Sequence, residues 1–405
     1  MNPNLEVGAD TEKQIDELRS WSLAVARPLA RESDRINDYP LSVSQVLQTC
    51  PIDICPTAIP SMNLTDDVLA ARPWLRTAAV DGKAQVAGRM IEAIVYGDGW
   101  AYQRLPNQGI AEDLVVKLGT PEQIDKYVGG IQRGDYTLSA WAMTEETGGN
   151  DVASIKTTLT PDGDEYILNG SKRFLSNGAS ADWAIVFATV DPGRGLAGIR
   201  AIIVELGTPG FTITHQYEEK LGQRYNRQGG YRFDNCRVPR ANFLAGKQDG
   251  GDTMGALRTF NRTRPFCNAY SVGLAQACLD YSYDMVRQQR AGMAQRRWDR
   301  IADEYDDMNA LLREQRELYY YATWRNDHGL SDIKESSQAK VQAPRLAESI
   351  ILRCLQLVGP EALSEDYLLE KWYRDIRLMD IVEGTAHIQK LVISRQLLGE
   401  TAARA

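Results

Sequence analysis

One carboxylate in the chain has sequence surroundings that suit an acid–base catalyst. Glu383 lies between two predicted helices, after a run of apolar residues and before Gly384 and Thr385. Apolar surroundings disfavour the charged form of a carboxylate, so its pKa rises toward the range of a general base. Gly384 allows the backbone to approach a ligand closely. The same spacing also suits a simpler role, in which Glu383 caps the helix that begins near Thr385.

Two further segments combine polar groups with a predicted strand. In the first, a strand runs into a Gly-rich turn in which Thr144 and Asn150 offer hydroxyl and amide groups. Such a turn suits a flat heteroaromatic ring or a phosphate, and it also suits an ordinary loop. In the second, Phe174 and Ser176 are two residues apart on a predicted strand and therefore face the same side. They suit either the covering of a ring or a core aromatic beside a strand-end hydroxyl.

A basic cluster completes the candidate chemistry. The segment Asn261–Pro265 contains two arginines and is predicted to begin a long helix. Cations at the start of a helix oppose its dipole, so these arginines are expected to have an anionic partner or to lie in a solvated turn.

Composition and charge argue against several other classes of protein. The chain has 405 residues, of which 43% are hydrophobic and 25% charged, and its formal net charge is -8. This acidity speaks against nucleic acid or an anionic membrane surface as a partner. Six cysteines without zinc spacing and only three histidines speak against a metal site and a Ser-His-Asp hydrolase. A polar, acidic N-terminus and the lack of a long apolar run predict a cytoplasmic protein.

Three regions with different sequence patterns must position these residues. Residues 1–135 indicate an N-terminal α-helical domain, residues 136–250 a middle β-barrel domain, and residues 251–405 a C-terminal four-helix bundle domain. The predicted fold class is therefore α+β. Within the barrel, Asn169-Gly170 is a hairpin signal between two strands. Within the bundle, Pro344 is expected to kink or break a helix that Ser331 caps.

Residue strings in the predicted barrel and bundle resemble the acyl-CoA dehydrogenase family, and the N-terminal third matches the family mainly in pattern. They include TEETGGND, GDEYILNGSKRFLSNG, LGQRYNRQGGYRFDNCRVP, NRTRP and YRDIRLMDIVEGTAHIQKLVISRQLLG, in the order and spacing of the family. The resemblance implies FAD bound between barrel and bundle. It also implies α,β-dehydrogenation of an acyl-CoA or acyl-carrier thioester and electron-transferring flavoprotein as the electron acceptor.

The resemblance also assigns roles to single residues. Glu383 matches the catalytic base in its medium-chain-type position, which removes an α-proton while hydride leaves Cβ for flavin N5. Arg264 matches the arginine of an active-site motif and, with Glu383 and Gly384, is expected to bind substrate. The residues that match cofactor-binding positions are Trp141, Met143, Thr144, Asn150, Phe174, Ser176, Arg290, Gln356, Gly359, Thr385 and His387.

The sequence departs from the family at two motifs that hold the FAD diphosphate across subunits. The Arg-x-x-Phe-Gly motif falls on residues 289–293 and lacks its Phe, and the Gly-rich motif after Gln356 is reduced to Gly359. Losing one charge-assisted hydrogen bond to phosphate costs about 1.5–3 kcal/mol. Either Arg290 or a nearby arginine compensates in a homo-oligomer, a dimer or tetramer, or a different subunit of a hetero-oligomer supplies the contact. A flavin oxidase or monooxygenase of the same fold is a further alternative.

Overall fold

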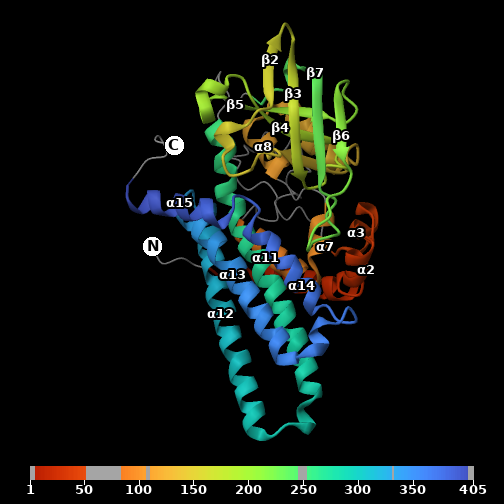
Figure 1. The fold of residues 1–405 in the computed structure, drawn as a ribbon, viewed down its shortest axis with the longest axis vertical. Helices are drawn as coiled ribbons and strands as arrows, with labels where there is room; N and C mark the ends of the chain where they lie inside the picture. Colours follow the sequence, from red (N-terminus) through yellow and green to blue (C-terminus); the bar gives the residue numbers. More distant parts are fainter. Residues whose placement is uncertain (1–4, 52–83, 106–109, 245–252, 331–332, 400–405) are drawn as a thin grey trace.

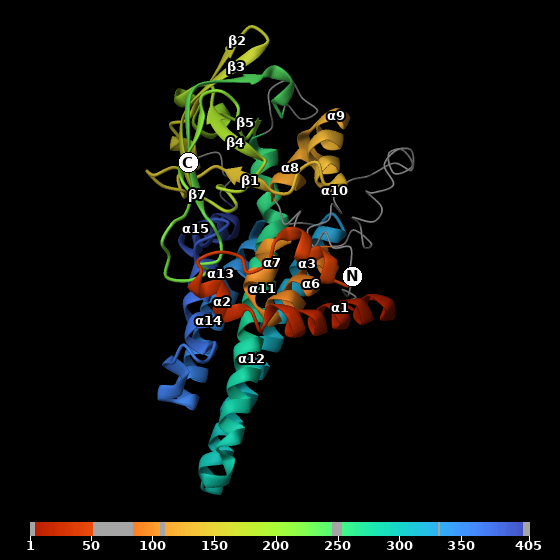
Figure 2. The ribbon, with the colours of Figure 1, turned by 90° about the vertical axis from the view of Figure 1, so that its right-hand side faces the viewer.

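The N-terminal region consists of helices, as the sequence predicts. The structure, a computed structural model, describes residues 5–51, 84–105, 110–244, 253–330 and 333–399. The helices of this region are α1 (Ala9–Trp21), α2 (Ala30–Arg35), α3 (Val43–Thr49), α6 (Ala84–Gly97), α7 (Gly99–Arg104), α8 (Ile110–Leu118), α9 (Pro121–Gln123) and α10 (Gly130–Arg133). Figure 2 shows α8 to α10 beside the sheet and the other helices of the region against the bundle.

The middle region forms a curled sheet of seven strands (Figure 1). The strands are β1 (Ser139–Ala142), β2 (Thr158–Asp162), β3 (Glu165–Leu175), β4 (Trp183–Thr189), β5 (Ile199–Glu205), β6 (Phe211–His215) and β7 (Gly229–Pro239). Their order is β1-β4-β2-β3-β7-β6, and β5 pairs with β4. The α+β class is thus confirmed. Two of the candidate segments extend from β1 and β3. Both strands end at the side of the sheet that faces the bundle.

The hairpin predicted at Asn169-Gly170 is wrong. β3 runs through this pair without a turn, and the hairpin that joins β2 to β3 is instead at Gly163. Gly170 has a φ of 138°, and the register against β7 shifts beside it. A Cβ added to Gly170 would lie 2.7 Å from the Cα atom of Thr157, so glycine is required for close approach of two strands.

The C-terminal region is a bundle of long helices. They are α11 (Thr253–Gln288), α12 (Gln295–Asp327), α13 (Ile333–Val358), α14 (Leu369–Ile376) and α15 (Ala386–Leu397). Figure 1 shows α11 and α12 extending far below the sheet and meeting in a turn at the lower end. α13 continues through Pro344, so a break there is excluded. The predicted cap at Ser331 lies outside the described residues.

The predicted start of the first bundle helix is wrong as well. α11 begins at Thr253, so Asn261–Pro265 lies inside the helix, where cations do not face the positive end of its dipole. α11 continues on both sides of Pro265. One hydrophobic cluster joins α6 to α11, α12, α13 and α14, which ties the N-terminal region to the bundle. The predicted domain limits stay predictions. None of the described helices is long and apolar enough to cross a membrane.

Candidate active site

Glu383 lies in the turn that connects α14 and its short 3₁₀ extension to α15. The backbone of Glu383 has a φ of 56° and that of Gly384 a φ of 85°. The cap of α15 is Thr385, whose hydroxyl oxygen accepts the N–H of Ile388 at 3.4 Å. Glu383 therefore does not cap this helix, and its carboxylate is left for another role.

A hydroxyl and two cations surround the Glu383 carboxylate. The Thr263 hydroxyl donates to Glu383 Oε2 at 2.7 Å, and Arg264 Nε donates to the main-chain oxygen of Glu383 at 3.3 Å. Burial raises the pKa of Glu383 to about 7, while the Thr263 hydrogen bond and the charges of Arg264 and Lys340 work in the opposite direction. A carboxylate that titrates near neutral pH is suited to accept a proton from a substrate.

Aromatic rings link this turn to the sheet. Arg264 is buried, its Nη1 donates to Asn261 Oδ1 at 3.0 Å, and its guanidinium lies 5.5 Å from the ring centre of Phe260. The ring centre of Phe260 is 5.4 Å from that of Trp141 on β1. The basic cluster predicted from the sequence thus has the main chain of Glu383 as a partner, and Trp141 approaches it from the sheet.

The Gly-rich turn after β1 also reaches the bundle. The Thr385 hydroxyl donates to Asn150 Oδ1 at 3.1 Å, which joins the end of this turn to the start of α15. At the start of the same turn, Met143 is buried, and the main-chain oxygen of Thr144 accepts the N–H of Arg173 at 3.0 Å. The turn is therefore held at both ends, between β3 and the helix that follows Glu383.

A buried ion pair supports this turn from inside the sheet. Lys172 Nζ donates to Glu145 Oε1 at 2.8 Å and to the main-chain oxygen of Met143 at 3.0 Å. Glu145 also accepts the hydroxyl of Thr157 at 2.6 Å. Burial lowers the pKa of Lys172 to about 8, and the Glu145 charge opposes this change. Sequence reasoning missed this pair, because two adjacent glutamates give no local sign of which one is buried.

Phe174 and Ser176 do not share a strand face, which corrects the sequence prediction. β3 ends at Leu175, so Ser176 lies beyond it, and Phe174 has a φ of 61° where the register against β7 shifts. Phe174 leaves 50% of its side chain exposed, which is unusual for an aromatic residue beside a core. Ser176 Oγ accepts a hydrogen bond from Asn226 Nδ2 at 3.2 Å. An exposed ring and a polar edge therefore lie next to each other for a different reason than the sequence suggests.

Comparison with known proteins identifies the family. The sequence profile of the acyl-CoA dehydrogenase middle domain matches residues 140–236, and that of the acyl-CoA dehydrogenase C-terminal domain matches residues 254–398. The chain belongs to the acyl-CoA dehydrogenase family. Its members are flavin oxidoreductases that act on the CH–CH bond of acyl-CoA. The family predicted from the sequence is thus confirmed, and this dehydrogenase is an enzyme of that class.

Two relatives and one solved structure illustrate the likeness. The dehydrogenase is 37% identical over 293 residues to an acyl-CoA dehydrogenase of Bacillus subtilis (strain 168), covering 72% of this chain and 76% of that protein. It is 35% identical over 292 residues to the acryloyl-CoA reductase (NADH) of Anaerotignum propionicum, covering 71% and 73%. The structure of butyryl-CoA dehydrogenase from Megasphaera elsdenii matches with a TM-score of 0.84 at 25% identity, over 97% of this chain and 99% of that one.

Three predicted cofactor residues lie far from Glu383 in this dehydrogenase. Arg290 is in the turn between α11 and α12, and Gln356 and Gly359 are at the end of α13 (Figure 1). From Arg264 to the end of α11 the helix rises by roughly 35 Å, so Arg290 is at the other end of the bundle. From Lys340, whose charge acts on Glu383, α13 rises by roughly 24 Å to Gln356. Arg290 donates to the main-chain oxygen of Met293 at 3.2 Å, within its own turn. His387 is exposed on α15.

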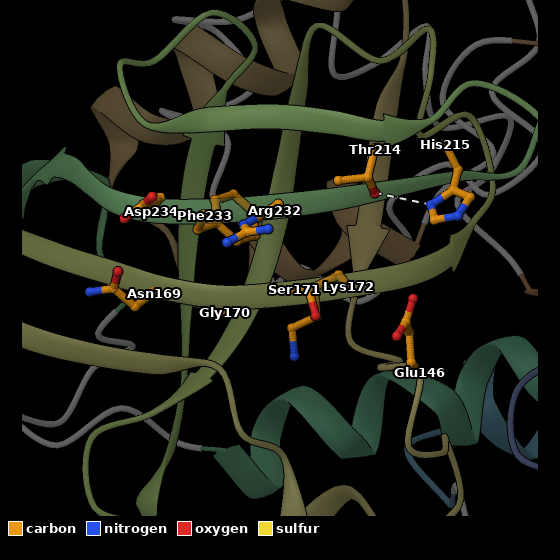
Figure 3. A pocket seen from close by; sticks show the side chains of 10 residues that line it. All are labelled: Glu146, Asn169, Gly170, Ser171, Lys172, Thr214, His215, Arg232, Phe233 and Asp234. Carbon is orange, nitrogen blue, oxygen red and sulfur yellow. Dashed lines mark hydrogen bonds between the residues drawn. The ribbon is translucent and has the colours of Figure 1, made fainter.

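A separate polar hollow of about 520 Å³ lies over β3, β6 and β7 (Figure 3). Its lining includes Ser171, Arg232 and the pair Thr214–His215, whose Oγ1 and Nδ1 atoms are 3.0 Å apart. None of the residues predicted to bind cofactor or substrate lines this hollow. Thr263 is the residue next to Glu383 that sequence reasoning did not single out, although it directly precedes Arg264 in the string NRTRP.

Proposed function

We propose that this protein is an FAD-dependent acyl-CoA dehydrogenase in which Glu383 removes the α-proton of an acyl thioester. The observation that carries the proposal is the partly buried Glu383 carboxylate, whose pKa is raised to about 7 and whose Oε2 is held by Thr263 at 2.7 Å. A base with such a pKa is largely ionised at slightly alkaline pH and still binds a proton well enough to take one from carbon.

The surrounding residues orient this base and the substrate. Thr263 fixes one carboxylate oxygen, which leaves the other to accept the proton. Arg264 holds the Glu383 main-chain oxygen at 3.3 Å, and the left-handed backbone of Glu383 and Gly384 sets the direction of the turn. We assign the N–H of Glu383 to the thioester oxygen, where it would stabilise the negative charge that develops as the proton leaves.

The residues at the end of the sheet fit a flat ring with polar edges, which supports FAD as the cofactor. Phe174 offers an exposed aromatic face, and Ser176 and Thr144 offer polar atoms beside it. FAD, when bound, supplies the acceptor for the second hydrogen. In this arrangement Phe174 covers the ring and Ser176 bonds its edge, while Trp141, Met143, Asn150, Thr385 and His387 complete the proposed cofactor contacts.

We further propose that the far end of the bundle serves the FAD of a neighbouring subunit. The separation of Arg290, Gln356 and Gly359 from Glu383 supports this, because one chain cannot hold one cofactor at both places. A homo-oligomer is the arrangement we favour, a hetero-oligomer is the alternative, and electron-transferring flavoprotein is the proposed acceptor. Arg290→Ala is expected to lower the FAD content of the purified oligomer, measured by absorbance against protein concentration.

The test is flavin bleaching by a panel of acyl-CoA thioesters in the purified holoenzyme. Glu383→Gln keeps the size and polarity of the side chain but removes the base, so bleaching should slow by about 10²–10⁴-fold with FAD content unchanged. Glu17→Gln, at an exposed carboxylate on α1, is the matched control and should bleach like the wild type. An unchanged bleaching rate in Glu383→Gln contradicts the assignment. Hydrogen peroxide release in place of acceptor reduction would indicate the oxidase alternative.

A further inference from the structure

A buried lysine and two carboxylates join the N-terminal region to the bundle. Lys371 Nζ on α14 donates to the two oxygens of Asp98 at 3.0 and 2.9 Å and to Asp375 Oδ2 at 2.7 Å. All three side chains are at most 1% exposed. Asp98 also caps α7 by accepting the N–H of Trp100 at 3.1 Å. Buried charges require such partners, so these groups fix α7 and α14 relative to one another.

The remaining oxygen of Asp375 holds a turn of the middle region. The main-chain N–H of Gln223 donates to Asp375 Oδ1, and Gln223 Nε2 donates to the main-chain oxygen of Asp375 at 3.2 Å. Gln223 is fully buried with a φ of 47°, a conformation that a residue of its type rarely adopts. A Cβ added to Gly222 would lie 2.1 Å from the main-chain oxygen of Arg374. The turn is therefore pressed against α14 and kept in a strained shape by Asp375.

The other side of this turn reaches the proposed flavin site. The N–H of Asn226 donates to the main-chain oxygen of Gln223 at 3.0 Å, and Lys220 Nζ donates to that of Asn226 at 2.7 Å. Asn226 is 1% exposed, and its Nδ2 donates to Ser176 Oγ at 3.2 Å. Because Ser176 accepts this hydrogen bond, its own O–H has to donate in another direction.

We infer that Asp375 is a positioning residue for Ser176. Through Gln223 and Asn226 it fixes the direction in which the Ser176 hydroxyl donates. This inference rests on the proposed function, in which that hydroxyl bonds the edge of the flavin ring. It adds that the ring's polar neighbour is set by a carboxylate on α14, which belongs to the bundle and itself touches neither cofactor nor substrate.

The midpoint potential of the bound flavin tests this inference without a substrate, because a donor at the ring edge stabilises the reduced and oxidised forms differently. The single variants are Asp375→Asn, Asn226→Ala and Ser176→Ala. The double variants combine Ser176→Ala with either Asp375→Asn or Asn226→Ala, and all are measured as FAD-loaded holoenzyme. Asn226→Ala leaves the buried ion pair intact and keeps the test valid if Asp375→Asn folds poorly. We expect Asp375→Asn and Asn226→Ala to shift the potential in the same direction as Ser176→Ala. The double variants should shift it no further than Ser176→Ala alone.

Asp327→Asn is the matched control. Asp327 accepts the N–H groups of Ala84 at 2.6 Å and Gln85 at 3.0 Å, so it is also a carboxylate that joins two helices, but it contacts no part of the turn. Its substitution should leave the potential unchanged. If Ser176→Ala itself causes no shift, the proposed place of Ser176 at the flavin is wrong and the inference falls with it. If Ser176→Ala causes a shift but folded Asp375→Asn or Asn226→Ala does not, or if the shifts add, only the inference is overturned.

Discussion

The raised pKa of Glu383 should cost the folded protein stability at alkaline pH, and Glu383→Gln should remove that cost. Burial raises the pKa of this carboxyl from 4.5 to about 7. Between these values the folded protein binds more protons than the unfolded chain, so the free energy of unfolding falls as pH rises through this window. The difference corresponds to about 3 kcal/mol as an upper limit, because the side chain is only partly buried.

Chemical denaturation of the holoenzyme at a series of pH values measures this effect. Glutamine keeps an oxygen that accepts the Thr263 hydroxyl, so the contact is preserved while the titration is lost. The free energy of unfolding of the variant should exceed that of the wild type by an amount that grows to about 2–3 kcal/mol between about pH 5 and about pH 8. Above about pH 8 this difference should stay constant. Glu17→Gln, whose exposed carboxylate is 3.7 Å from Lys13, should stay within about 0.5 kcal/mol of the wild type throughout. A difference for Glu383→Gln that is constant with pH would refute the reasoning.

Three other substitutions probe the supports of the site. Thr263→Val removes the hydrogen bond that lowers the pKa of Glu383, so the pH midpoint of flavin bleaching should rise by about one unit, and an unchanged midpoint would contradict the role of Thr263. Lys172→Met leaves Glu145 buried without its cation and should lower the free energy of unfolding by about 3–5 kcal/mol, most of which Glu145→Gln in the same chain should restore. Gly384→Ala places a Cβ 2.4 Å from a side-chain amide at a φ of 85°, so bleaching should slow while FAD content is kept.

The local features of the site were predictable where one stretch of sequence carries them. The apolar residues before Glu383 and the glycine after it indicated a turn with a perturbed carboxylate, and the structure has both. The competing role as a helix cap was also compatible with the sequence. Only the placement of the Thr385 hydroxyl against Ile388 decides between the two. At Asn169-Gly170 the local signal was misleading, because a glycine that permits close strand approach looks like a glycine that permits a turn.

The partners of the site residues were not predictable, because they are distant in the chain. Thr263 and Glu383 are 120 positions apart, and Gln223 and Asp375 are 152 positions apart. No period or cap signal connects such pairs in a single sequence. The start of α11 shows the same limit, since Pro265 was interpreted as the first turn of a helix that begins at Thr253.

Strained backbone marks the site more specifically than any of its residue types. Among the described residues, six other than glycine have a positive φ, and three of these are asparagines, which tolerate that conformation. The other three are Phe174, Gln223 and Glu383. Such strain persists only where the surroundings enforce it. Gln223 and Glu383 are each held at a main-chain atom, by the Asp375 carboxylate and by Arg264 Nε respectively, and Phe174 directly follows the Arg173 N–H that donates to Thr144. The backbones of Gln223 and Glu383 are therefore fixed by side chains that are distant in the sequence. Weakening one of these contacts should alter the chemistry of the site before it unfolds the chain.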